Sequence, residues 1–211
     1  TPSNSSAASD VYKRQDQNQW IKLVDKINDM QPDLLILGGD IVDNNTPDSY
    51  YTLLTDTLGR LQPAFGKFCV EGDNEAEQTN DYAEQMEKAG VTFLKDQTAY
   101  LYNQYRLIGL RDMSDKDKIL PSSYLEQIKK DSPYTIVISH RPRKLEDIAR
   151  YNVNLTLCGH TAGGQYPLTG WIENLSSDMI YGIKKTGTMT VVTTSGVGQY
   201  GIPSKIMAPA E

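Results

Sequence analysis

Short apolar runs alternate with helical segments along most of this chain, and this alternation limits the fold more than any other feature. The apolar residues between Trp20 and Ile27 have the i, i+3, i+4, i+7 spacing of an amphipathic helix. The apolar run at residues 34–37 follows Pro32 and stops at a glycine pair, as in a short buried strand. Strands that alternate with helices predict an α/β fold whose parallel strands are covered on both faces.

The same reasoning extends the alternation to residue 194. It predicts strands over residues 68–70, 98–102, 105–110, 135–139, 155–158 and 189–194 and helices starting at Pro47 and spanning 79–89 and 145–150. We expect the strands at 98–102 and 105–110 to form a hairpin. Ser123 and Glu126 have the spacing of a capping box, which predicts a helix that contains Leu125 and Ile128.

Length and charge exclude several classes of protein. The 211 residues suit one large domain at roughly 150 residues per domain. No apolar run approaches the roughly 20 residues that a membrane-spanning helix needs. A net charge of -6 argues against a nucleic-acid partner, and we expect a monomer. The two cysteines, Cys69 and Cys158, are too few for a disulfide scaffold, so they leave the compartment open.

Residues 1–15 differ in composition from the rest. They are rich in Ser and Ala and show neither helical nor strand periodicity, and they lack the apolar core of a secretory signal. The string at residues 5–15 resembles translated sequencing-adapter read-through. We therefore expect residues 1–15 to be a non-native or disordered tail and residues 16–211 to form the domain, with its first strand missing or replaced.

Four predicted strands end in polar groups that can bind a metal ion. The groups are Asp40, then Asp73 with Asn74 and Glu75, then His140, then His160, and these are the only histidines in the chain. Ligands of open α/β sheets bind outside the carboxyl ends of the strands, so these side chains are expected to meet at one edge. Two carboxylates with two imidazoles suit Mn, Fe or Zn better than Ca or Mg.

Each of these residues also has an ordinary structural interpretation. An Asp after a strand usually caps a helix or occupies a turn, and a single His is more often structural than a ligand. Four such strand ends that include both histidines are hard to explain in that way. Cys69 and Cys158 are interpreted as small buried apolar residues. Asp43 is interpreted as a brace for the turn at Asp40.

The strings GGDIVD, EGDNE, SHRP and CGHTAGGQ, in this order, resemble the calcineurin-like metallophosphoesterases from about Trp20 onward. They are most similar to a bacterial branch with a GHTHGGQ-type signature and a glycine-rich tail. This resemblance implies a four-layer α/β/β/α sandwich with two metal ions at the strand ends. It implies that Asp40 bridges the two metal ions and that Asp73, His140 and His160 complete one site, Asp73 standing where the family usually has Asn.

Other residues take their expected roles from the same resemblance. Asn74 replaces a family His that assists the leaving group, and Arg141 is placed to contact phosphate, although such an Arg is more often a surface ion pair. We expect Gly159, Gly163, Gly164 and Gln165 to shape the cleft, although turn geometry alone also explains the glycines.

The other metal site departs from the family pattern. No Asp-x-His pair precedes Asp40, and Ala162 replaces the second His of the GHxH motif. We therefore expect at most one tightly bound divalent transition metal ion. The prediction is a metal-dependent phosphohydrolase that activates water and has impaired activity.

The alternative is a degenerate family member that binds a metal ion or a phosphorylated ligand without turnover. A nucleotide-binding α/β fold is a weaker alternative, because no G-x-G-x-x-G or P-loop string is present. The expected substrate is a phosphorylated small molecule or a lipid-linked phosphate. The expected location is cytoplasmic, or peripheral to a membrane through a segment upstream of the chain.

Overall fold

The computed structural model describes residues 20–42, 48–76, 81–113, 122–161 and 177–196, together with Asn18 and Thr46. Its helices are residues 20–30, α2 (Asp48–Arg60), α3 (Asp73–Ala76), α4 (Asp81–Lys88) and α5 (Leu145–Ala149). Its strands are β1 (Leu35–Leu37), β2 (Lys67–Cys69), β3 (Val91–Phe93), β4 (Gln97–Leu101), β5 (Tyr105–Gly109), β6 (Tyr134–Ile138), β7 (Leu155–Cys158), β8 (Gly182–Thr186) and β9 (Met189–Thr193).

The strands form two sheets. The first sheet holds β1, β2 and β3 in that order, and all its pairings are parallel. The second has the order β4-β5-β6-β7-β9-β8, with parallel strands in the centre and antiparallel strands β4 and β8 at the two edges. Because parallel strands run in one direction, the residues that follow β1 and β2, and those that follow β6 and β7, leave each sheet at a common edge.

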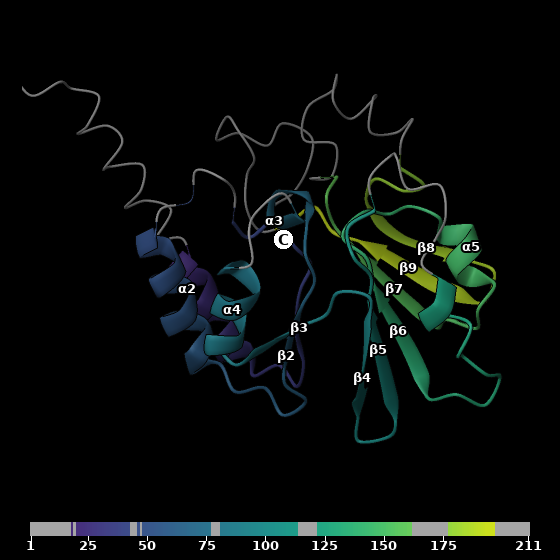
Figure 1. The fold of residues 1–211 in the computed structure, drawn as a ribbon, viewed down its shortest axis with the longest axis horizontal. Helices are drawn as coiled ribbons and strands as arrows, with labels where there is room; N and C mark the ends of the chain where they lie inside the picture. The colour runs from purple at the N-terminus through teal and green to yellow at the C-terminus, as the bar shows by residue number, and fades with distance from the viewer. Residues whose placement is uncertain are drawn as a thin grey trace, which may run out of the picture.

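Three separate apolar cores show that the two sheets pack face to face between layers of helices. One core joins β1 and β2 to β5, β6 and β7 across the space between the sheets, and it includes Phe68, Leu107 and Ile138. A second lies between the first sheet and the helices of residues 20–30, α2 and α4. A third lies between the second sheet and α5. The result is the predicted four-layer α/β/β/α sandwich, with α2 and α4 on one side and α5 on the other (Figure 1).

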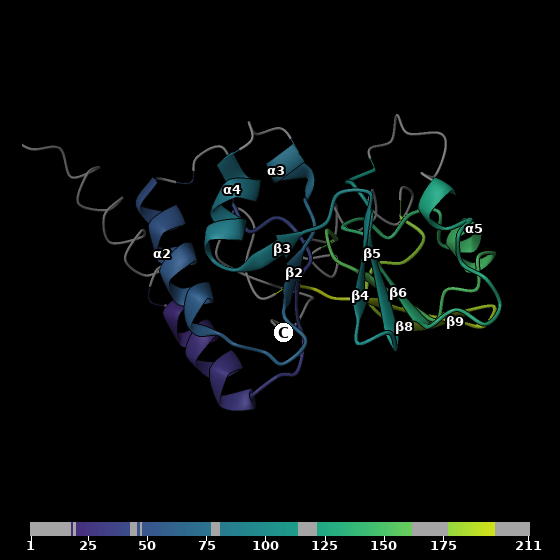
Figure 2. The same ribbon diagram turned by 60° about the horizontal axis from the view of Figure 1, so that its bottom comes forward.

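A buried lysine connects β2 to two helices of the outer layer. Lys67 is 6% exposed, and its Nζ donates hydrogen bonds to the carbonyls of Leu58 (2.7 Å) and Ala89 (2.8 Å). These carbonyls lie near the C-terminal ends of α2 and α4, where a positive charge is favourable. Burial lowers the pKa of the Lys67 amine. Both helices lie on the same side of β2 and β3 (Figure 2).

Most predicted elements are present, and the differences are local. The hairpin of β4 and β5 is confirmed. The helix predicted over residues 79–89 is α4, which has Tyr82 and Met86 buried and is followed by Gly90, whose φ is +71°. The helix predicted from Ser123 and Glu126 is wrong: a 3-10 turn covers Ser122–Tyr124, and turns follow. Leu125 and Ile128 are nevertheless buried in the core beside α5, and the Ile128 N–H donates to the Leu125 carbonyl at 3.0 Å.

Candidate metal centre

Two carboxylates reach the site from the first sheet. Asp40 follows β1 in a left-handed conformation with φ of 56°, and Asp73 begins α3 just after β2. The turns that carry them are in contact, since a Cβ on Gly39 would lie 2.5 Å from the Gly72 nitrogen and one on Gly72 would lie 2.2 Å from Asp40 Oδ1. Glycine is therefore required at both positions, and it brings the two turns together.

Two imidazoles reach the same place from the second sheet. His140 lies two residues beyond β6 and is only 2% exposed, and His160 lies two residues beyond β7 with φ of 67°. The Gly159 N–H donates to the carbonyl of His140 at 2.9 Å, which ties the two histidine turns together. The ring centroids of the two histidines are 5.2 Å apart.

The four side chains converge into one cluster. One potential ligand atom from each of Asp40, Asp73, His140 and His160 lies within 4.8 Å of all the others. His140 Nε2 lies 3.2 Å from Asp40 Oδ2 and 3.1 Å from Asp73 Oδ1, and His160 Nδ1 lies 2.9 Å from that same Asp73 oxygen. The structure thus brings together all four residues that the sequence singled out as metal ligands.

The His140 ring is oriented as a metal ligand requires. Its Nδ1 donates a hydrogen bond to the Gly38 carbonyl at 2.7 Å, so Nε2 is the ring atom that faces the carboxylates. A ligand histidine usually has one ring N–H held by a carbonyl or carboxylate in this way, which fixes its tautomer. Two carboxylates and two imidazoles at these spacings therefore fit a divalent transition metal ion.

The charges within the cluster shift two pKa values in opposite directions. Burial alone would lower the pKa of His140, but its hydrogen bonds with Asp40 and Asp73 outweigh burial and raise this pKa to about 10. Burial would raise the pKa of Asp73, yet hydrogen bonds from both histidines and the charges of His160 and Arg141 hold it well below its usual range. Without a metal ion, these shifts favour a charged His140 imidazole and an ionised Asp73 carboxylate.

Glu75 holds the two carboxylate-bearing turns in place. Its side chain is buried, and it accepts four backbone N–H bonds. Oε1 accepts from Ile41 (2.6 Å) and Val42 (3.0 Å), whereas Oε2 accepts from Asp40 (2.8 Å) and Gly72 (2.8 Å). Burial raises the pKa of Glu75, and the N–H bonds oppose that shift.

Arg141 lies between two aspartates beside the cluster. Its Nη2 is 3.4 Å from Asp73 Oδ2, and its Nε is 3.0 Å from Asp112 Oδ1, close enough for an ion pair although the angle is not that of a hydrogen bond. Burial raises the pKa of Asp112, and the charge of Arg141 opposes that shift. Asp112 follows β5, so a third strand of the second sheet also reaches the cluster.

The remaining predicted site residues divide into two groups. Asn74 lies beside the cluster, and its backbone N–H donates to Asp40 Oδ1 at 3.1 Å. Gly159 lies in the turn before His160 and makes the contact with His140 already described. Asp43, Gly163, Gly164 and Gln165 lie outside the described residues, as does Ala162.

Sequence reasoning missed Asp112 and the function of Glu75. Asp112 comes after the apolar run at residues 107–110, so the rule that found the other strand ends also applies to it. Glu75 was noted at its strand end, but nothing in the sequence indicates that its carboxylate turns back toward residues 40–42. Only the contact between the two turns reveals that role.

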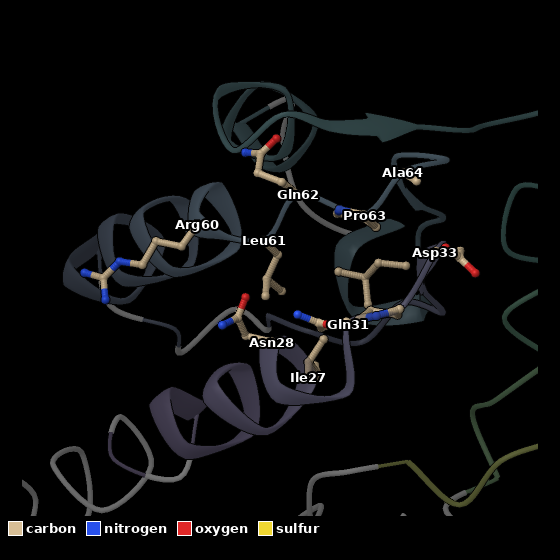
Figure 3. Close-up of a pocket in the computed structure, with 11 residues that line it drawn as sticks. Ile27, Asn28, Gln31, Asp33, Arg60, Leu61, Gln62, Pro63 and Ala64 are labelled. Atoms are coloured by element: carbon tan, nitrogen blue, oxygen red, sulfur yellow. The ribbon is translucent and has the colours of Figure 1, made fainter.

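A pocket of about 460 Å³ lies elsewhere, at the opposite end of the first sheet. It is bordered by Leu35, the first residue of β1, and by Asn28, Gln31 and Gln62 (Figure 3). The metal cluster follows the other end of β1, so this pocket is not part of it.

The helices in the described part of the chain are all too short or too polar to span a lipid bilayer.

Comparison with known proteins agrees with this geometry. The calcineurin-like phosphoesterase family model matches residues 7–164. A metallophosphoesterase of Aquifex aeolicus is 30% identical over 219 residues, a match that covers 97% of this chain and 80% of the relative. The phosphodiesterase YaeI of Escherichia coli is 30% identical over 189 residues, which is 82% of this chain and 67% of that protein.

Some relatives are longer than this chain, which spans about half the length of related proteins in Helicobacter pylori and Campylobacter jejuni.

Among solved structures, the protein TT1561 of Thermus thermophilus has a TM-score of 0.52 and 15% sequence identity, and the match covers 86% of this chain and 83% of that one. This likeness concerns the fold alone. The fold, the family match and the identity to these relatives together show that the chain belongs to the calcineurin-like phosphoesterase family.

Proposed function

We propose that this chain is a metal-dependent phosphohydrolase that works from a single tight metal site and has low activity. The observation that carries the proposal is the convergence of Asp40, Asp73, His140 and His160, whose potential ligand atoms lie within 4.8 Å of one another. Family membership supports hydrolysis of phosphate esters as the reaction.

The four clustered residues would hold Mn²⁺, Fe²⁺ or Zn²⁺. A bound ion of this kind supplies a Lewis acid that polarises a phosphoryl oxygen and lowers the pKa of water. The protein's own part is to hold the ligands in place. Gly38 orients the His140 ring, and Glu75 fixes the turn of Asp40.

Two neighbouring residues bear on the substrate. Arg141 supplies a positive charge beside Asp73, which favours a phosphate anion at the cluster. Asn74 also borders the cluster, but an amide side chain has no proton of suitable pKa to give to a leaving group. Loss of a general acid typically costs about 10²–10⁴-fold in rate, which is why we propose slow turnover.

The proposed substrates are phosphodiesters or phosphomonoesters of small molecules or lipid-linked groups. The name of the E. coli relative, a phosphodiesterase, favours diesters. Ala162, at the second histidine position of the GHxH motif, supports the second candidate function, which is binding of a metal ion or a phosphorylated ligand without turnover.

Turnover with a matched set of variants tests the proposal. Hydrolysis of bis(p-nitrophenyl) phosphate and p-nitrophenyl phosphate is measured with added Mn²⁺, alongside elemental analysis of bound metal. We expect slow wild-type hydrolysis that is lost in His140→Ala and retained in Asp96→Asn, since the Asp96 carboxylate pairs with exposed Arg111 rather than with the cluster.

The outcomes separate the two functions. Wild-type protein that binds one metal ion without hydrolysing either ester would favour the binding function instead. Protein that binds no ion at all would refute the phosphohydrolase and the metal-binding form of the second function. Two tightly bound ions per chain would contradict the single-site part of the proposal.

A further inference from the structure

The guanidinium of Arg141 is enclosed by carboxylates rather than directed freely into solvent. The Arg141 side chain is 13% exposed and that of Asp112 is 5% exposed. Arg141 contacts Asp112 through Nε at 3.0 Å and Asp73 through Nη2 at 3.4 Å. A guanidinium held through two different nitrogens has little freedom to rotate toward another partner.

Asp112 is itself held from the first sheet. Its backbone N–H donates to Glu71 Oε1 at 3.3 Å, and the other Glu71 oxygen lies 2.7 Å from Lys95 Nζ. Glu71 is 5% exposed and lies two residues beyond the end of β2. The position of Arg141 is therefore set by residues that follow β2 and β5, as well as by its own turn after β6.

The charge of the cluster needs a counter-charge. With neutral imidazoles, the two aspartates of the cluster contribute two negative charges, which a divalent ion would cancel. In the described part of the chain, the ion pairs of these two aspartates are with His140, His160 and Arg141. Once a metal ion has displaced the proton of His140, Arg141 is the one of these that is always charged.

We propose that Arg141 is the internal counter-charge of Asp73, that Asp112 is its positioning residue, and that the guanidinium held in this way offsets negative charge that would otherwise repel a phosphate anion. The inference rests on the metal site of the proposed function. Counting Asp40, Asp73, Asp112, a divalent ion and Arg141, the loaded site has no net charge. Without Arg141 it would carry one negative charge, which would repel an incoming phosphate.

Charge arithmetic gives a test that separates this role from direct contact with phosphate. Arg141→Gln removes one positive charge and Asp73→Asn removes one negative charge, so the double variant has the wild-type net charge with neither group. Asn keeps an oxygen that can bind a metal ion. Arg111→Gln is the matched control, because Arg111 pairs with Asp96 and is 44% exposed.

Two binding constants are measured by calorimetry, first for Mn²⁺ alone and then for inorganic phosphate added to Mn²⁺-saturated protein. We expect Arg141→Gln to bind Mn²⁺ more tightly and phosphate about tenfold more weakly, and Asp73→Asn to do the opposite. The double variant should bind phosphate within about threefold of wild type. Asp112→Asn should weaken phosphate binding although it removes a negative charge, because Arg141 is then no longer held beside Asp73. Arg111→Gln should leave both constants unchanged.

Each remaining outcome is decisive. A double variant that binds phosphate as weakly as Arg141→Gln would show that the guanidinium touches phosphate itself, which overturns the inference and leaves the proposed function intact. Wild-type protein that binds no Mn²⁺ would overturn the proposed function and this inference with it. If Arg141→Gln does not fold, the opposite shifts expected in Asp73→Asn still support or refute the inference.

Discussion

The carboxylate of Glu75 should contribute more to stability than any other polar group around the cluster. The perturbation is Glu75→Gln, which preserves size and shape but replaces one oxygen with an NH₂ group. Each Glu75 oxygen accepts two backbone N–H bonds, from Ile41 and Val42 on one side and from Asp40 and Gly72 on the other. Glutamine can satisfy only one of these pairs.

The expected loss of stability follows from the two backbone N–H groups that glutamine leaves without an acceptor. Two buried N–H donors lose their acceptor and face another donor, at about 1–3 kcal/mol for each unsatisfied group, so the expected loss is roughly 2–6 kcal/mol. For a domain of this size, each kcal/mol lowers Tm by about 2–4 °C. We therefore expect Tm to fall by roughly 4–24 °C and Mn²⁺ affinity to fall with it, because Asp40 would no longer be held.

The assay is thermal and urea unfolding of metal-free protein, with Glu71→Gln as the control. Glu71 is as buried as Glu75 but accepts a single backbone bond at 3.3 Å and pairs with half-exposed Lys95, so its loss should cost about 1 kcal/mol. If the free energy of unfolding of Glu75→Gln lies within about 1 kcal/mol of that of wild type, this reasoning is refuted, because the two turns would then keep their conformation without the Glu75 carboxylate.

Further predictions concern pH, the buried lysine and a glycine. Because the pKa of His140 is raised to about 10, its proton stabilises the metal-free protein fully below pH 6.5, and this stabilisation is lost as pH rises to 10. Mn²⁺ must displace this proton, so Mn²⁺ binding should release a proton and become tighter from about pH 7 to 9. Calorimetry in buffers of different ionisation enthalpy measures both effects. Lys67→Met should lower the free energy of unfolding by about 1–3 kcal/mol in urea titrations, since two buried carbonyls lose their donor; an unchanged midpoint would argue against that role. Gly39→Ala, at φ +91° and with a Cβ 2.5 Å from the Gly72 nitrogen, should reduce Mn²⁺ affinity and Tm together. Gly59→Ala in helix α2, with nothing near its Cβ, should leave Mn²⁺ affinity unchanged and raise Tm slightly.

The sequence predicted the cluster because its ligands obey a simple rule. Asp40, His140 and His160 each come two or three residues after a strand, and parallel strands of one sheet end at the same edge. The sequence predicts one edge for all of them, but the aspartates follow strands of the first sheet and the histidines follow strands of the second. Their meeting therefore depends on how the two sheets pack. The four-layer arrangement itself was predicted from the family resemblance, because apolar periodicity does not determine which face of one sheet packs on which face of the other.

The elements that were missed have weak local signals. β3 spans three residues, and β8 reads Gly-Ile-Lys-Lys-Thr, in which two charged residues break the alternation expected of a strand. β8 is an edge strand, and lysines on an edge disfavour pairing with another chain. The roles of Glu75 and Asp112 depend on contacts between turns that are 33 or more residues apart, which no local pattern encodes.

The division of the cluster between two sheets has a consequence for folding. The contacts of His140 with Gly38 and Asp73 span 102 and 67 residues, and that of His160 with Asp73 spans 87. Such long closures become favourable only after the sandwich has formed, so the ligand set should be assembled late on the folding pathway. An ion bound there would link the two sheets of the domain. Because such an ion binds only the native state, it would stabilise the folded domain against separation of the two sheets.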